Sequence, residues 1–253
     1  MFNIALNTFK EIVRNKFLYL ILIFWLLFIL FSISLWKLSI WDDQKIITDF
    51  GISMIEIFWL VWVLFVWSQL LFKEIEWKTI FLILSKPIKR YEFILGKFFG
   101  FWLVITLITF VQSILYFVVL AIKWISIDWL IVASIFFILL KLLILVWIVL
   151  FLSSFMSTIL TIIVSIMIYF ASHSFSLIID LVNRLNVSVV TYLTKAVQLI
   201  FPPFEAMNLR DFIWSNVKFS IMYFVWNTTY AIAYLVIILV ATSIIFNNKK
   251  FEN

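Results

Sequence analysis

The chain has 253 residues, of which 66% are hydrophobic and only 13% are charged, whereas soluble domains carry about 25% charged residues. This composition excludes an ordinary soluble domain, and the lack of cysteine excludes disulfides, thiolate metal ligands and cysteine nucleophiles. The net charge is +6. We expect these cations to set the membrane topology and to attract anionic lipid headgroups, and we expect no binding of nucleic acid.

The first element, residues 2–16, has apolar residues at helical spacing. Phe2, Leu6, Phe9 and Val13 share one face, and polar side chains occupy the other. This pattern predicts an amphipathic helix that lies in the membrane interface. The helix either anchors the first span or has a specific role, and the pattern favours neither.

Six apolar blocks follow, each long enough to cross a hydrocarbon core about 30 Å thick at about 1.5 Å per helical residue. They cover residues 17–36, 51–72, 98–120, 129–151, 157–179 and 222–246. The first block follows a segment with Glu11 and lacks a small-residue cleavage site, so we expect a retained span and not a signal peptide. The predicted fold is an all-α integral membrane domain over residues 1–253, with six transmembrane helices.

The distribution of Lys and Arg predicts the orientation of these spans. Eleven of these residues lie in loops on the N-terminal side, against seven in the longer loops on the other side. Loops rich in Lys and Arg remain in the cytoplasm. Both termini are therefore predicted to be cytoplasmic, in a multi-pass protein of the cytoplasmic membrane.

The cytoplasmic loop 73–97, KEIEWKTIFLILSKPIKRYEFILGK, is too apolar to be a solvated connector. Residues 75–84 are predicted to form a helix of about two to three turns, which Pro87 ends. The apolar side of this helix needs either a membrane surface or a protein partner, and the residues alone favour neither. The cations that follow it suit lipid phosphates or an acidic protein surface.

The external segment 180–221 is predicted to contain one amphipathic helix and a second short element. Apolar residues recur every four positions from Leu181 to Val197, which is typical of one helix face. This helix should end before Phe201 and the two prolines that follow it. Residues 204–214 are expected at the outer interface, because their aromatic side chains suit headgroup depth.

Three ionisable residues fall inside the predicted spans, where each is a functional hypothesis by default. Glu56 is expected about 8 Å below the outer end of the second block, and Lys141 near the middle of the fourth. Because these depths differ, a salt bridge would require tilt or a long lysine reach. Lys141 is otherwise expected to face a polar cavity or to snorkel.

The third ionisable residue, His173, lies in the outer part of the fifth block. Ser172, Ser176 and Asp180 follow one another at intervals of four and predict a polar stripe on this helix. The stripe either lines a substrate path or only bonds to backbone carbonyls and neighbouring helices.

No enzyme site is predicted. The sequence contains neither a phosphate-binding loop of the form GxxxxGK[ST] nor a GxSxG nucleophile elbow. A single histidine without cysteine cannot supply the three or four ligands of a zinc site, so no metal is expected. Uphill transport would take its energy from another polypeptide or from an ion gradient.

The loop 73–97 resembles the first cytoplasmic loop of ABC-2 type transporter permeases, the membrane subunits of many ABC exporters. The family pattern has an acidic cluster, a Thr after a Gly or basic residue, Leu-Leu-Ser-x-Pro, an Arg three residues later, and a Gly-Lys that opens the third span. Here Ile83 precedes Leu84, and Lys78 replaces the commoner Gly. The residues that this resemblance assigns to the coupling loop are Glu74, Glu76, Lys78, Thr79, Phe81, Leu82, Ser85, Pro87, Arg90, Gly96 and Lys97.

The resemblance implies that the loop forms a coupling helix that docks on a cytoplasmic ABC ATPase. Two permease subunits, identical or different, would assemble with two ATPase copies in the lipid bilayer and export a substrate. ATP and Mg would bind to the ATPase, and this chain would bind no cofactor. A secondary transporter and a membrane-embedded lipid-modifying enzyme are the alternatives; the first would need broken spans and inverted repeats, the second a cluster of acids or histidines at one depth.

Overall fold

The computed structural model describes residues 2–14, 43–64, 90–184, 188–215, 217 and 219–248, with single residues 19, 22, 23, 26 and 30. All regular structure within these residues is helical. Most of the predicted first span, 17–36, lies outside the described residues. The same is true of these coupling-loop residues: Glu74, Glu76, Lys78, Thr79, Phe81, Leu82, Ser85 and Pro87.

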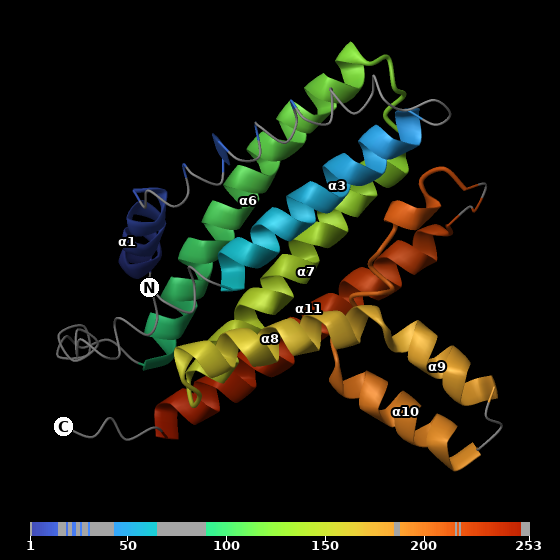
Figure 1. Ribbon diagram of the computed structural model, residues 1–253. Coiled ribbons are helices and arrows are strands. Elements are labelled where there is room, and N and C mark those ends of the chain that lie inside the picture. The colour runs from blue at the N-terminus through green and yellow to red at the C-terminus, as the bar shows by residue number, and fades with distance from the viewer. Residues whose placement is uncertain are drawn as a thin grey trace.

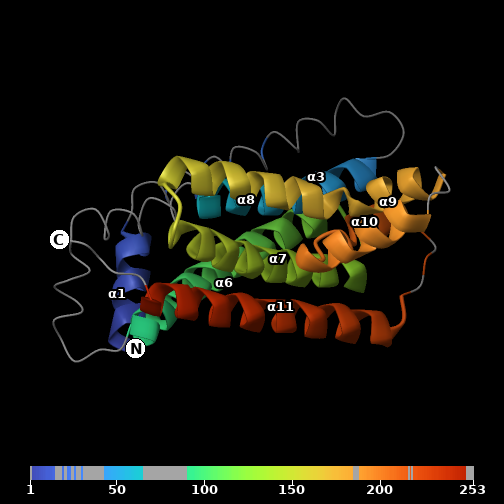
Figure 2. The same cartoon turned by 90° about the horizontal axis from the view of Figure 1, so that it is seen from below.

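Five long helices form a bundle, in which α7 is central (Figures 1 and 2). The helix α7 contacts the other four helices, and 78% of its most apolar stretch is buried, against 11% for α11. Apart from Lys141, its long side chains are apolar on every side, which is typical of a helix surrounded by others. The five are α3 (Asp43–Trp62), α6 (Arg90–Ile122), α7 (Trp129–Ser153), α8 (Thr158–His173) and α11 (Ile221–Asn248).

Within the described residues, three helices are long and apolar enough to cross a membrane. These segments are Leu95–Ile122, Trp129–Ser153 and Ile221–Ile245. A fourth span is possible if α8 and the helix that follows it cross together, although the angle between the two helices is 59°. The prediction of an all-helical chain with helices able to cross a membrane is thus confirmed for the described residues, while the number of six spans stays a prediction.

Two of the helices begin before the apolar blocks that predicted them. The helix α3 begins at Asp43, before residue 51, and α6 begins at Arg90, before residue 98, because backbone hydrogen bonding extends a helix through polar residues that hydropathy excludes. The external segment contains two helices where one was predicted, α9 (Phe175–Arg184) and α10 (Ser188–Ile200). They lie side by side (Figure 1), so each covers part of the other, which a single helix could not do.

The N-terminal helix α1 (Phe2–Val13) packs across the first half of α6 (Figure 1). Gly100 permits this close approach: a Cβ atom at Gly100 would lie 2.7 Å from the carbonyl oxygen of Ala5 and 2.7 Å from Cβ of Thr8. An ion pair of 3.8 Å joins Lys97 Nζ to Glu11 Oε2 in the same contact. The α1 helix is therefore attached to the part of α6 that follows the loop 73–97.

We expect Gly100→Leu to displace α1 from α6, because the new side chain would meet backbone and not only a flexible side chain. A cysteine placed at Thr8, which is 2% exposed, should be protected from a thiol reagent in the parent protein and should react in the variant. The chain has no other cysteine, so labelling is specific. Val111→Leu, on the exposed side of α6, is the control and should leave the position protected; equal protection in both variants would contradict the contact.

Candidate functional site

Glu56 and Lys141 lie at the same depth, contrary to the sequence-based expectation. The helices α3 and α7 both begin at the end of the bundle that carries α9 and α10 (Figure 2). At about 1.5 Å per helical residue, Glu56 lies roughly 20 Å from the start of α3 and Lys141 roughly 18 Å from the start of α7. The expected difference in depth arose because depth was measured from Gly51, whereas α3 begins at Asp43.

The two side chains form a buried ion pair. Lys141 Nζ lies 2.5 Å from Glu56 Oε1, and the exposed fractions of these side chains are 2% and 12%. Lys141 therefore neither snorkels nor faces lipid. A lone charge at this depth is costly, and pairing with hydrogen bonds offsets much of that cost.

The helix α8 adds two further side chains to the pair. Tyr169 lies roughly 17 Å from the start of α8, and Lys141 lies roughly 18 Å from the end of the antiparallel α7, so they meet at one level. The hydroxyl of Tyr169 donates to Glu56 Oε1 at 2.8 Å. One turn later, Nε2 of His173 lies 3.5 Å from Lys141 Nζ and 3.6 Å from Glu56 Oε1. We call these four residues the buried network.

The hydrogen bonds of His173 determine its tautomer. Its Nδ1 lies 3.0 Å from the carbonyl oxygen of Tyr169, which can only accept, so Nδ1 carries a proton. The ring then presents Nε2 toward Lys141 and Glu56.

The external segment is hydrogen-bonded to α3 next to the buried network. The 3-10 helix η2 (Arg210–Phe212) contacts α3 and α7. Nη1 of Arg210 donates to Ser53 Oγ at 2.6 Å, and its Nε donates to Asp211 Oδ1 at 3.4 Å. Ser53 precedes Glu56 by less than one turn of α3, so this contact lies next to the buried network.

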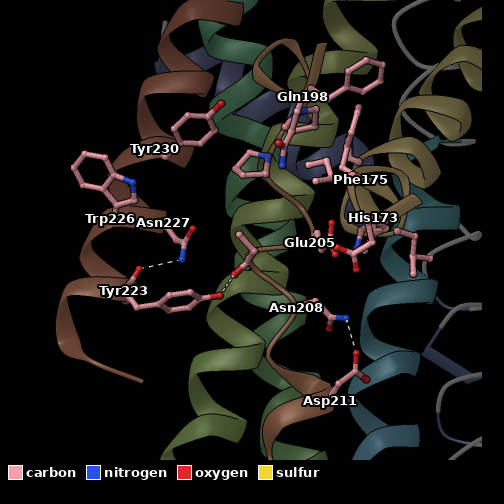
Figure 3. A pocket seen from close by; sticks show the side chains of 18 of the residues that line it. His173, Phe175, Gln198, Glu205, Asn208, Asp211, Tyr223, Trp226, Asn227 and Tyr230 are labelled. Carbon is pink, nitrogen blue, oxygen red and sulfur yellow. Dashed lines mark hydrogen bonds between the residues drawn. The ribbon is translucent and has the colours of Figure 1, made fainter. Parts of the chain in front are cut away.

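A cavity of about 800 Å³ opens beside the buried network, toward the end of the bundle that carries α9 and α10. Figure 3 shows Tyr223, Trp226, Asn227 and Tyr230 of α11 on one side and His173 on the other. The segment 201–212 runs between them. Because His173 lines the cavity and also contacts Lys141, it joins the cavity to the buried network.

The predicted polar stripe is divided between the cavity and the backbone. Ser172 and Asp180 both line the cavity, but the Ser172 hydroxyl donates to the carbonyl oxygen of Ile168 at 2.7 Å. The side chain of Ser176 lies outside the described part. The bend after His173 interrupts the stripe, because α9 leaves the direction of α8 by 59°.

The predicted site residues separate into two groups. Glu56, Lys141 and His173 are brought together, whereas Arg90, Gly96 and Lys97 lie in the first turns of α6, toward the opposite end of the bundle (Figure 1). Sequence reasoning missed Tyr169, although its position four residues before His173 places it on the same helix face. It also missed Glu205 and the α11 residues of the cavity, although the spacing of Tyr223, Trp226 and Tyr230 places them on one helix face.

The described residues contain no group of three or more acidic, histidine or cysteine side chains that could hold a metal ion. In the buried network, Glu56 already accepts hydrogen bonds from Lys141 and Tyr169. It is therefore placed to hold α3, α7 and α8 together. A comparison with protein-family models finds no match, and no curated protein matches the sequence.

Proposed function

We propose that this chain is the membrane-spanning permease subunit of an ABC-2 type transporter, which exports a substrate across the cytoplasmic membrane. The sequence of the loop 73–97 carries the proposal, because an apolar helix between charged ends on the cytoplasmic side requires a binding surface. A separate ABC ATPase supplies that surface and binds ATP and Mg. Two six-span permease subunits and two ATPase subunits complete the transporter.

The contact between α1 and α6 supports this mechanism. The loop leads into α6 at Arg90, and α1 is attached to α6 at Gly100 and Lys97. If the loop moves with its bound ATPase toward the other ATPase subunit, α6 and α1 would therefore move together. The buried network would carry this movement to α3 and α8, because α7 packs against α6 and bears Lys141.

A secondary transporter is the second candidate, and one observation favours it. Ionisable groups inside a membrane bundle are typical of proton relays, and His173 lies within 3.6 Å of both Glu56 and Lys141. Transport in sealed vesicles separates the two proposals. The permease needs ATP and tolerates a protonophore, whereas a proton-coupled carrier needs the gradient and works without ATP.

The orientation is tested by single cysteines, since the chain has none of its own. In intact cells Ser85→Cys should be shielded from an impermeant thiol reagent, because the positively charged loop lies in the cytoplasm. Asn208→Cys, which lines the outer cavity, should react. Both should react with a permeant reagent, which controls for buried positions, and the reverse pattern would overturn the orientation.

The energy supply is tested with the purified chain. Because the sequence contains no phosphate-binding loop, we expect the isolated chain neither to bind nor to hydrolyse ATP. Addition of the ATPase subunit should restore ATP-dependent transport in proteoliposomes. Tight ATP binding by the isolated chain, measured by equilibrium dialysis, would contradict the assignment.

A further inference from the structure

We propose that the outer cavity binds organic cations whose charge is attached to an apolar or aromatic body. Its volume of about 800 Å³ lies within the range of roughly 300 to 1,000 Å³ that is usual for small-molecule sites. Calling these cations substrates rests on the proposed function. The binding itself rests on the side chains that line the cavity.

Aromatic rings form much of the cavity wall. Tyr223, Trp226 and Tyr230 line it from one face of α11, as Figure 3 shows. Phenylalanine side chains line it from the other elements; these are Phe175, Phe201 and Phe212. Aromatic faces attract organic cations through the ring quadrupole and also cover their apolar parts.

The charge of the cavity is negative. Its lining includes Asp180, Glu205 and Asp211 and, among the described residues, neither lysine nor arginine. Asp211 is partly neutralised by Arg210, whose Nη1 is directed to Ser53 and away from the cavity. Asp180 is exposed and Glu205 is half-buried, where charges are screened less than at the surface.

The lining favours an organic cation over a metal ion or an anion. The three carboxylates come from α9, the segment 201–209 and η2, and no metal-binding group is found among the described residues. An anion would be repelled by the three carboxylates and would find no lysine or arginine among the described lining residues. An organic cation satisfies both the rings and the carboxylates, with its charge near Glu205.

Equilibrium binding of tetraphenylphosphonium to the purified chain in phosphatidylcholine nanodiscs tests the inference. We expect saturable binding that tetraphenylborate, which has nearly the same shape and the opposite charge, does not displace. Glu205→Gln should raise the Kd about 10-fold through the loss of a charge partner. Trp226→Leu should raise it about 3- to 10-fold, because one cation–π contact is lost.

Two further variants keep the test decisive. Asp180 is exposed, so Asp180→Asn should not disturb folding. This variant should also weaken binding, and the result then does not depend on how well Glu205→Gln folds. Asp128→Asn removes an exposed carboxylate outside the cavity that makes no side-chain cap bond, and should change the Kd less than about 2-fold. Equal binding of tetraphenylborate, or an unchanged Kd in all three cavity variants, would overturn the inference.

The assay contains no ATPase, so it separates the two proposals. Absent cation binding in a chain that assembles with an ATPase overturns only the cavity assignment. Cation binding by a chain that assembles with no ATPase overturns only the proposed function.

Discussion

Lys141→Leu is expected to abolish transport and to lower the free energy of unfolding by about 3 to 5 kcal/mol. The substitution removes the cation that lies 2.5 Å from Glu56 and leaves a buried carboxylate with Tyr169 as its remaining neutral donor. The span stays apolar, so insertion into the membrane should be preserved. Unfolding in mixed micelles and transport in proteoliposomes measure the two effects.

The double variant distinguishes loss of the pair from exposure of a single charge. Removing both charges with Glu56→Gln and Lys141→Met should destabilise the protein less than Lys141→Leu alone, because no unpaired charge remains buried. Lys45→Leu is the control, because it removes an exposed cation from α3. It should change the unfolding free energy by less than about 0.5 kcal/mol. Unchanged stability and transport in Lys141→Leu would show that the ion pair has no role.

Phe81→Asp or Leu82→Asp is expected to abolish both ATPase association and transport. A coupling helix over residues 75–84 would bury its apolar side in the ATPase and keep Glu74, Glu76 and Lys78 at the rim. An aspartate at the buried centre would lack a partner, at a cost of about 2 to 7 kcal/mol or more. The spans do not depend on this contact, so the variants should still insert and fold.

Both positions need to be tested, since only one of them has to face the partner. Phe81→Leu and Leu82→Met keep the surface apolar and serve as matched controls, which should copurify with the ATPase at normal yield. If both aspartate variants also copurify at normal yield, residues 75–84 form only a membrane-surface helix and the coupling assignment is wrong.

Long apolar helices could be predicted closely from the sequence. The predicted span 129–151 corresponds to α7 (Trp129–Ser153), and 222–246 corresponds to α11 (Ile221–Asn248). A membrane fixes the length of such segments, and their composition marks where they begin and end. Length and hydropathy together are therefore enough to place helices such as α7 and α11 in the sequence.

The buried network could not be predicted from hydropathy, because hydropathy does not report where a helix begins. The start of α3 at Asp43 places Glu56 about two turns further from the helix start than the apolar block suggests. The hairpin of α9 and α10 was missed for a related reason. Apolar residues spaced by four fit one long helix as well as two short ones, and only the packing between the two helices distinguishes them.

The outer cavity depends on contacts between distant segments. Glu205, Asp180 and the aromatic residues of α11 come together only when the external segment folds back over the bundle. Helical spacing places the aromatic residues on one face of α11, but no spacing rule links that face to Asp180 or Glu205. The hydroxyl of Tyr223, which donates to the carbonyl oxygen of Ala206, is one of the contacts that hold this arrangement.

The central claim, that this chain works with a separate ABC ATPase, is tested most directly by isolating the tagged protein from native membranes. We expect the purified complex to contain an ABC ATPase in equal amount and to hydrolyse ATP, and expect Phe81→Asp or Leu82→Asp to lose that subunit. A chain that is isolated in active form without any ATPase, and that transports with an ion gradient alone, would contradict the account.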